Sequence, residues 1–287
     1  MVPEHGDRLT ERWTCPTCHR TAETPFCPMC GERPLSARDL TLRGFLEHSI
    51  RGALKIDGRL IRSFRCLVSH PGVLTVAYLH GQRKLYNTPL QLFFLANLLF
   101  FAVHFQAETK VFSAPLRSHL HEQPWSAVAA RLTTKHLEKA HTTLDLYAPV
   151  FDRAVALHAK SMNILMMLPF ALLTPILFYS SRRPFVAHVV FSLHFYAFLL
   201  LLFCVVSAAL GIYEFHYGVT SIPDTLDHVL SFLLIGVCAA YLSMAARTVY
   251  GTRGAGRALV AIVLTVAVAG TVLGYRFALL LITLYST

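Results

Sequence analysis

Residues 186–212 read VAHVVFSLHFYAFLLLLFCVVSAALGI, a stretch without any Asp, Glu, Lys or Arg. A helix needs about 20 apolar residues to cross the hydrocarbon core of a bilayer, which is about 30 Å thick. This stretch is therefore predicted to be a transmembrane helix. Four further apolar stretches predict helices of the same kind, at 89–106, 161–180, 227–247 and 259–284. The expected fold class is an all-α integral membrane protein with about five transmembrane helices.

The overall composition also indicates a membrane protein. Hydrophobic residues make up 54% of the 287 residues, and charged residues only 15%. The formal net charge of +10 would fit a nucleic-acid-binding protein. However, 13 of the 26 Lys and Arg lie in residues 1–84, directly before the first apolar stretch, where basic residues meet anionic lipid head groups. We therefore expect membrane lipids as partners, and nucleic acid is disfavoured.

The chain divides by composition into three parts. They are a cysteine-rich head, a basic amphipathic collar and a transmembrane helical bundle, at residues 1–34, 35–88 and 89–287. The bundle includes a long hydrophilic loop at 107–160, expected on the outer side. Within this loop, residues 125–140 and 144–158 have helical patterns.

Two Cys-x-x-Cys pairs, separated by eight residues, define the head: Cys15, Cys18, Cys27 and Cys30. Two residues between cysteines allow a tight turn that points both sulfurs at one ion, and two such turns complete a tetrahedron. We expect a structural zinc ion, because four thiolates leave no coordination position for a catalytic water. A redox-active thiol site, or two disulfides in an oxidising compartment, are the alternatives.

The collar alternates basic and apolar residues at helical spacing. Ser36, followed by Asp39 three residues later, predicts a helix start. Gly58 is expected to separate two helices, and Pro71-Gly72 to end the second. Such helices lie in the membrane interface or pack on the cytosolic face of the protein itself, and both arrangements can hold together.

The distribution of positive charge predicts the orientation in the membrane. The first 84 residues contain no pattern of a secretory signal peptide, so we expect the amino terminus to stay in the cytosol. With five spans, the cytosolic segments carry 18 Lys and Arg, against seven in the loop at 107–160. This asymmetry agrees with the positive-inside rule and places the carboxyl terminus outside.

Several motifs resemble those of one known family. They are Phe26-Cys27 and Cys30-Gly31 in the head, the aromatic stretch Phe191-Ser192-Leu193-His194-Phe195, and the collar residues His70-Pro71-Gly72, Tyr78, Gly81-Gln82-Arg83-Lys84, Tyr86 and Pro89. The chain resembles an uncharacterised family of bacterial inner-membrane proteins with an amino-terminal zinc ribbon, known as a domain of unknown function. The resemblance is close over residues 1–90 and loose beyond. It implies this architecture and an inner-membrane location, and it carries no activity.

Arg83 and Lys84 lie directly before the first predicted span. Interfacial cations at such a position fix the depth to which a helix inserts. Alternatively, the two residues contact a lipid phosphate or an anionic substrate that enters from the cytosol.

A second metal site is a further candidate, formed by His119, His121, Glu122, Glu214 and His216. His119-x-His121 presents two imidazoles on one face if the segment is extended, and the loop at 213–226 is expected on the same side of the membrane. If these groups converge, they could bind a metal ion that activates water. Without convergence they are scattered surface residues.

Three ionisable residues inside or beside the spans are also candidates: His194, Asp227 and Arg276. Such residues usually face the bundle interior or a cavity. His194 either lines a polar path or bonds to a neighbouring helix. Because a charge at the bilayer centre costs roughly 3 kcal/mol or more, we expect Arg276 to pair with Asp227 or Glu214.

The leading hypothesis is a non-enzymatic inner-membrane protein that handles a small solute, an ion or a lipid. Its zinc head would brace the bundle or bind a cytosolic protein. The alternatives are a membrane-embedded, metal-dependent enzyme acting on lipid or an envelope precursor, and a scaffold or sensor that does not transport. The sequence has no Gly-x-Ser-x-Gly, phosphate-binding glycine loop or His-Glu-x-x-His. Homo-oligomerisation stays open.

Overall fold

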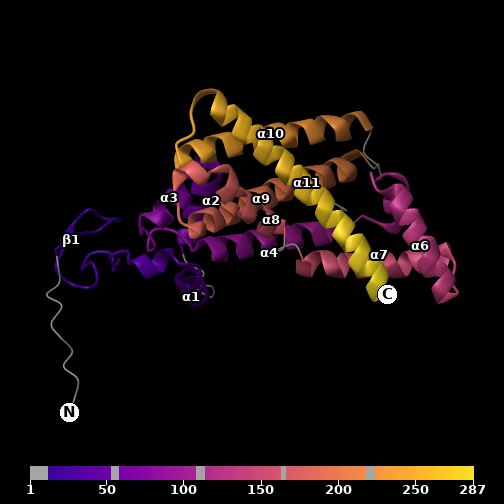
Figure 1. Ribbon diagram of the computed structural model, residues 1–287, viewed down its shortest axis with the longest axis horizontal. Helices are drawn as coiled ribbons and strands as arrows, with labels where there is room; N and C mark the ends of the chain where they lie inside the picture. The colour runs from indigo at the N-terminus through magenta and orange to yellow at the C-terminus, as the bar shows by residue number, and fades with distance from the viewer. Residues whose placement is uncertain (1–11, 53–57, 108–113, 163–165, 218–223) are drawn as a thin grey trace, which may run out of the picture. The chain divides into compact units, whose positions relative to one another are not determined.

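The computed structural model describes residues 12–52, 58–107, 114–162, 166–217 and 224–287, and most of these residues are helical (Figure 1). The chain forms two compact units. Unit 1 comprises Met1–Asn97, Thr174–Leu200 and Ala240–Ala261, and unit 2 comprises Leu98–Leu173, Leu201–Ala239 and Ile262–Thr287. Because the long helices run through both units, each unit is built from segments that are distant in sequence.

Unit 1 begins with the head. Its strands β1 (Trp13–Thr14) and β2 (Thr21–Ala22) pair antiparallel, with Trp13 opposite Ala22. The turn between the two strands carries the first cysteine pair, Cys15 and Cys18. So short a sheet has almost no hydrophobic core, and a segment of this size needs an additional source of folding energy.

The collar contains η1 (Ala37–Leu40), α1 (Leu42–Gly52), α2 (Arg59–Ser69) and α3 (Val73–Leu79). The helix start predicted at Ser36 is confirmed, since the Ser36 backbone N–H and hydroxyl donate to the Asp39 carboxylate at 2.9 and 2.8 Å. The predicted end at Gly72 is also confirmed. Gly72 has φ +85°, a conformation that glycine adopts at little cost, and α3 follows directly.

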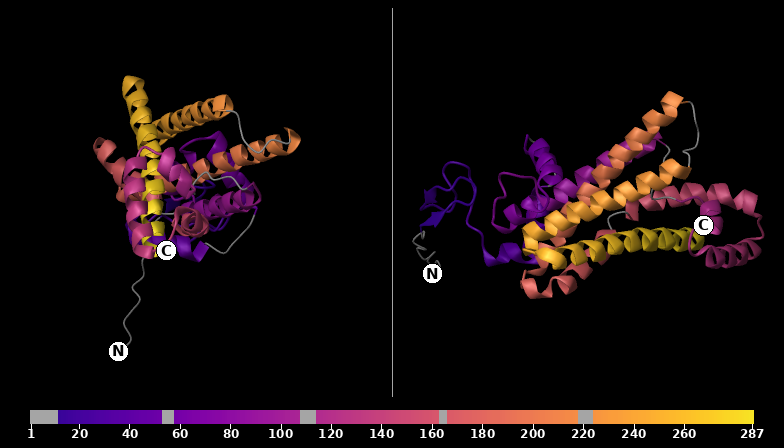
Figure 2. Two further views of the ribbon diagram at one scale, coloured as in Figure 1. Left: turned by 90° about the vertical axis from the view of Figure 1, so that its right-hand side faces the viewer. Right: turned by 90° about the horizontal axis from the view of Figure 1, so that it is seen from above.

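Within the described residues, three helices are long and apolar enough to cross a membrane. They are α9 (Phe185–Tyr217), α10 (Asp224–Tyr250) and α11 (Gly254–Ser286), which can be followed along their length in Figure 2. They confirm the predicted spans at 186–212, 227–247 and 259–284 as membrane-length helices.

The other two predicted spans correspond to shorter apolar helices. The first lies in α4 (Pro89–Ala107), whose apolar part is Pro89–Val103. The second, predicted at 161–180, is shorter in the structure: α8 covers Met167–Leu177, and η3 (Tyr179–Ser181) follows it. Eleven residues span about 16 Å as a helix. Pro175 within α8 removes a backbone donor and crowds the preceding turn, which favours a short helix.

Within unit 1, α3 lies directly against α10. A Cβ atom added at Gly72 would come within 2.8 Å of Thr248 Cβ and 2.9 Å of the Ala245 carbonyl oxygen, so only glycine allows this approach. One turn later, Thr75 Oγ1 lies 2.9 Å from Nδ1 of His194 on α9. The collar thus packs against the end of α10 and the start of α9 in one core.

Unit 2 contains α5 (Leu116–His121), α6 (Ser126–Ala140) and α7 (Leu144–Met162). The helices α6 and α7 confirm the helical patterns predicted at 125–140 and 144–158, whereas α5 was not predicted. The helix α7 contacts α11. The Tyr275 hydroxyl donates to the Ala159 carbonyl at 2.8 Å, and Thr283 Oγ1 lies 3.1 Å from His158 Nδ1. These helices therefore pack on the bundle segments of unit 2.

Candidate metal centre and its junction with the collar

The four cysteine sulfurs of the head lie within 4.8 Å of one another. Cys15 and Cys30, like Cys18 and Cys27, have their Sγ atoms 3.4 Å apart, and Cys18 and Cys30 are 3.9 Å apart. In a tetrahedral site with Zn–S bonds of about 2.3 Å, neighbouring sulfurs lie about 3.8 Å apart. The predicted cysteine cluster is therefore confirmed as a group that can bind a metal such as zinc.

Both cysteine pairs have the same backbone geometry. The N–H of the residue after each pair donates to the carbonyl of the first cysteine: His19 to Cys15 at 2.9 Å, and Gly31 to Cys27 at 2.8 Å. His19 and Gly31 have φ of 59° and 69°, in the left-handed region. This turn directs both sulfurs of a pair to one side, and its repetition completes the four-sulfur cluster.

The thiols of Cys27 and Cys30 differ in pKa. Backbone N–H groups of Cys30 and Met29 lower the pKa of the Cys27 thiol to about 6. Burial raises the pKa of the Cys30 thiol to about 12. Because metal ligands must be thiolates, a bound ion displaces the proton of Cys30, and metal affinity falls as the pH decreases.

Glu32 joins the head to the collar. Its backbone carbonyl accepts from the Cys27 N–H at 2.6 Å, which places it in the second cysteine turn. Its Oε2 accepts from the Thr17 hydroxyl at 3.0 Å and from the backbone N–H groups of Arg83 and Lys84, each at 2.9 Å. The Glu32 residue is 2% exposed. We call this set of contacts the junction.

A second contact links the same collar segment to the first cysteine turn. Gln82 Nε2 donates to the Pro16 carbonyl at 2.7 Å. Gly81, with φ +83°, lies against Leu35, whose Cβ would be 3.4 Å from an added Cβ. The turn before α4 is thus attached to both cysteine turns.

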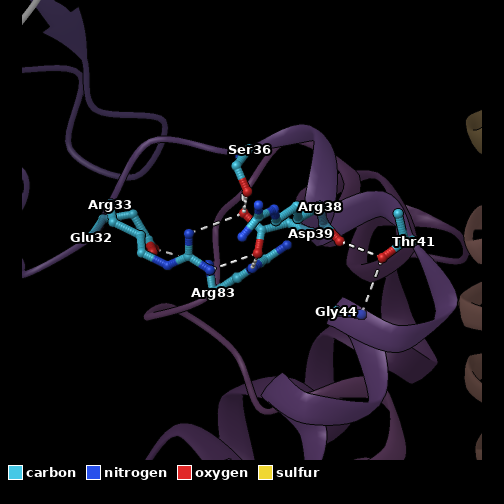
Figure 3. A network of polar contacts seen from close by, with 8 residues as sticks. All are labelled: Glu32, Arg33, Ser36, Arg38, Asp39, Thr41, Gly44 and Arg83. Atoms are coloured by element: carbon cyan, nitrogen blue, oxygen red, sulfur yellow. Dashed lines mark hydrogen bonds and ion pairs between the residues drawn. The ribbon is translucent and has the colours of Figure 1, made fainter.

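Asp39 strengthens the junction because it lies between two guanidinium groups (Figure 3). Its carboxylate is 2.6 Å from Arg33 Nη2 and 2.9 Å from Arg83 Nη1. Burial alone would raise the pKa of Asp39, but the hydrogen bonds and ion pairs from Arg33, Ser36 and Arg83 lower it well below its ordinary value. Asp39 therefore stays ionised and holds both arginines.

The structure places the two candidate basic residues differently. Arg83 has a side chain that is only 5% exposed, and its Nη1 pairs with Asp39, whereas Lys84 is exposed. Of the two residues, only Lys84 is therefore available as a surface cation. The sequence could not separate the two, because the burial of Arg83 depends on Asp39, which is distant along the chain.

The residues of the expected second metal site do not come together in the described part of the chain. His119 and His121 lie on helix α5, not on an extended segment, so the two side chains point about 200° apart. His119 is buried and accepts from Trp125 Nε1 at its Nδ1 (3.2 Å), while His121, Glu122 and His216 are exposed. The side chain of Glu214 lies outside the described residues. Among those described, only the four cysteines form a metal-ligand cluster.

The intramembrane candidates have different environments. His194 is 5% exposed and bonds to Thr75, as the hydrogen-bonded alternative expected. Arg276 lies on α11 in unit 2. The side chains of Asp227 and Glu214, the expected partners of Arg276, lie outside the described residues.

The structure contains two cavities of interest. In unit 2, a groove of about 440 Å³ runs along α11, and we call it the α11 groove; its lining includes Pro169, Gly270, Thr271, Gly274, Tyr275 and Ala278. In unit 1, a cavity of about 10 Å³ lies beside the junction, and we call it the Arg83 cavity; its lining includes Tyr78, Arg83, Asn87, Pro89 and His194.

Sequence reasoning missed Glu32 and the pairing of Asp39. Glu32 is two residues after the last cysteine, and Asp39 was noted only as a helix-capping residue. Their proximity to the motif and to Ser36 was a weak signal, since acidic residues are common at such positions. Arg83, which contacts both acidic residues, lies 51 residues after Glu32 and 44 residues after Asp39, and no local pattern encodes such distances.

Comparison with known proteins adds one finding. Residues 57–101 match the model of a family described as "Protein of unknown function (DUF3667)". The matched segment includes the collar residues from His70 to Pro89 that carried the resemblance, and it spans α2, α3 and most of α4. No curated protein and no solved structure matches the chain.

Proposed function

We propose that the protein is an integral membrane protein of the bacterial inner membrane whose head is a structural zinc brace for the membrane region. The junction is the observation that carries this proposal. A buried carboxylate from the second cysteine turn accepts hydrogen bonds from the backbone N–H groups of Arg83 and Lys84, in the segment that leads to α4. Because a zinc-bound turn would fix Glu32, it would also fix the start of the first apolar helix.

The bundle, in this proposal, binds a lipid. Of the three classes expected from the sequence, a lipid agrees best with the α11 groove, because its lining is mostly apolar. Its polar groups are also engaged elsewhere: the Thr271 hydroxyl donates to the Ala267 carbonyl and the Tyr275 hydroxyl to Ala159. An ion or a polar solute would need free polar groups there.

The distribution of charge supports a cytosolic head. Half of the Lys and Arg lie in the head and collar, as the positive-inside rule expects for a cytosolic segment. The helix α2 exposes Ile61 and Val68 (78% and 53%) beside the exposed Arg62 and Arg65. An apolar surface flanked by arginines is typical of a helix in the membrane interface.

A cytosolic protein partner is a second candidate role for the head. Phe26 and Met29 of the second cysteine turn are 60% and 61% exposed. Exposed aromatic and methionine side chains are enriched at protein interfaces. Bracing and partner binding use different faces of the head, since the junction buries Glu32.

Hydrogen exchange tests the brace. The amides of Arg83 and Lys84 are protected by the Glu32 carboxylate, so removal of zinc from the purified protein in detergent should accelerate exchange in a peptide covering 81–86. A peptide from α6, which lies in unit 2, serves as the control and should not change. If metal analysis shows zinc loss and the 81–86 peptide exchanges at its original rate, the brace is wrong.

A further inference from the structure

Three buried residues that line the Arg83 cavity have side-chain polar atoms without a hydrogen-bond partner among the described residues. The atoms are Arg83 Nε and Nη2, Asn87 Nδ2 and the Tyr78 hydroxyl oxygen. Arg83, Asn87 and Tyr78 are 8%, 6% and 5% exposed. Because buried polar side chains are nearly always hydrogen-bonded, four such atoms around one cavity point to a ligand.

The chemistry of these atoms selects an anion. Nε and Nη2 form one edge of the guanidinium of Arg83, the edge opposite Nη1, which pairs with Asp39. That edge offers two neighbouring N–H donors, which can both reach one oxygen of an oxyanion. Asn87 Nδ2 and the Tyr78 hydroxyl add further donors. A cation is repelled by such a set, and a water molecule must donate as well as accept.

The remaining contacts hold these donors in place. The Tyr78 ring lies under the guanidinium, with its centroid 5.1 Å from Arg83 Cζ. The Asn87 backbone N–H donates to Ser63 Oγ at 2.9 Å, and Asn87 Oδ1 lies 3.2 Å from the same atom. The site is therefore preorganised by the protein, as binding sites for charged ligands usually are.

Size and position indicate a phosphate group. A cavity of about 10 Å³ holds a group the size of one water molecule, which suits a single oxygen of a larger anion. Lys84 is exposed next to Arg83 and adds a second positive charge, which favours a phosphate over a carboxylate. Pro89, the first residue of the apolar helix α4, also lines the cavity, so the cavity lies at the end of an apolar helix, where a lipid phosphate would be found if this helix enters the membrane.

We propose that Arg83, Asn87 and Tyr78 form a binding site for a phosphate group, carried by a lipid head group or by free phosphate. This site shares Arg83 with the junction but uses other atoms of that residue, Nε and Nη2, and it is separate from the α11 groove. The site lies in unit 1 and the groove in unit 2, so the tests of the two give independent results.

The test uses the full-length, zinc-loaded protein in detergent and measures Kd by isothermal titration. The probes are inorganic phosphate, phosphatidic acid in mixed micelles, diacylglycerol in the same micelles as a phosphate-free lipid, and chloride. We expect saturable binding of at least one phosphate probe and none of diacylglycerol. Binding of inorganic phosphate identifies the free anion as a ligand, and binding of phosphatidic acid alone identifies the head group.

Two variants address the site itself. Tyr78→Phe removes one donor and keeps the ring, and Asn87→Asp places a negative charge beside the anion. Each should raise Kd by about tenfold, the effect of losing one hydrogen bond to a charged group. Tyr179→Phe, at an exposed tyrosine, is the matched control and should bind as the unmodified protein does. If Asn87→Asp fails to fold, Tyr78→Phe is sufficient.

Three results would overturn the proposal. The first is the absence of saturable binding of either phosphate probe. The second is the same Kd for Tyr78→Phe and the unmodified protein. The third is binding of chloride alone, which would make the cavity a halide site.

Discussion

Glu32 connects two parts of the chain through one carboxylate oxygen. A carboxylate that is 2% exposed is unfavourable unless hydrogen bonds replace its water. Here the Thr17 hydroxyl and two collar N–H groups donate hydrogen bonds to the carboxylate in place of water. The carboxylate of the head is therefore an acceptor for the donors of the turn before α4. Neither part keeps this arrangement if the other is displaced.

Substitution of Glu32 by Gln should destabilise the protein by about 1–3 kcal/mol, because the neutral amide accepts more weakly and brings its own N–H₂ near three donors. Glu23→Gln is the matched control, since its ion pair with Arg12 is exposed and worth less than about 1 kcal/mol. The measurement is the free energy of unfolding of both variants in the same detergent. Equal losses would contradict the role of the junction.

His119 predicts a pH dependence of stability. Burial, together with the nearby positive charge of Arg276, lowers the pKa of His119 to about 4, below its ordinary value of about 6.5. The unfolded chain therefore binds this proton more readily than the folded one. The stability from neutral His119 is complete above about pH 6.5 and is lost as the pH falls toward about 4.

His119→Gln should therefore show a smaller loss of thermal stability between about pH 6.5 and pH 4 than the unmodified protein. The exposed neighbour His121→Gln provides the control and should keep the original pH profile. Effects of acid on the cysteine site are common to all three proteins and cancel in the comparison. Identical profiles for His119→Gln and the unmodified protein would exclude His119 as the titrating group.

Among the secondary-structure elements, the long apolar helices and the cysteine turns could be predicted from the sequence because their signals are local. Length and lack of charge define α9, α10 and α11, and Cys-x-x-Cys spacing defines the cluster. The short helix within 161–180 also has a local signal, since Pro169 and Pro175 disfavour a long regular helix there. The junction and both cavities could not be predicted, because they depend on contacts between distant residues.

The contact between α3 and α10 makes Gly72 sensitive to substitution. Gly72→Ala adds a Cβ within 2.8 Å of Thr248 and forces a positive φ on alanine, so we expect a loss of about 1–3 kcal/mol. Gly236 lies within α10, and a Cβ atom added there meets nothing within 4 Å. Gly236→Ala should therefore be neutral or slightly stabilising. Thermal unfolding of both variants provides the measurement. A neutral Gly72→Ala would show that α3 does not pack this closely on α10.

The α11 groove can be filled at Gly274, where an added Cβ meets nothing within 4 Å. Gly274→Leu should reduce the lipid retained per protein after detergent purification, measured by native mass spectrometry. Gly256→Leu, at an equally open glycine of the same helix outside the groove lining, controls for the added apolar surface. Equal lipid retention in both variants would show that the groove does not hold lipid.

In the molecule as a whole, the cysteine cluster, which can bind a metal such as zinc, is linked through unit 1 to the apolar helices. An ion that binds only the folded head stabilises whatever folds together with it. The head has its own metal-ligand cluster, yet its Glu32 and Pro16 contact the collar, and the collar shares a core with α9 and α10. Loss of the ion should therefore destabilise these helices as well as the head.

The most direct test follows the helical signal during thermal unfolding of the full-length protein, with zinc bound and after chelation, in the unmodified chain and in Glu32→Gln. We predict that chelation lowers the Tm of the helices in the unmodified chain, and that it has much less effect in Glu32→Gln, where the junction is already weakened. An unchanged Tm of the unmodified chain after confirmed zinc removal would contradict the zinc brace.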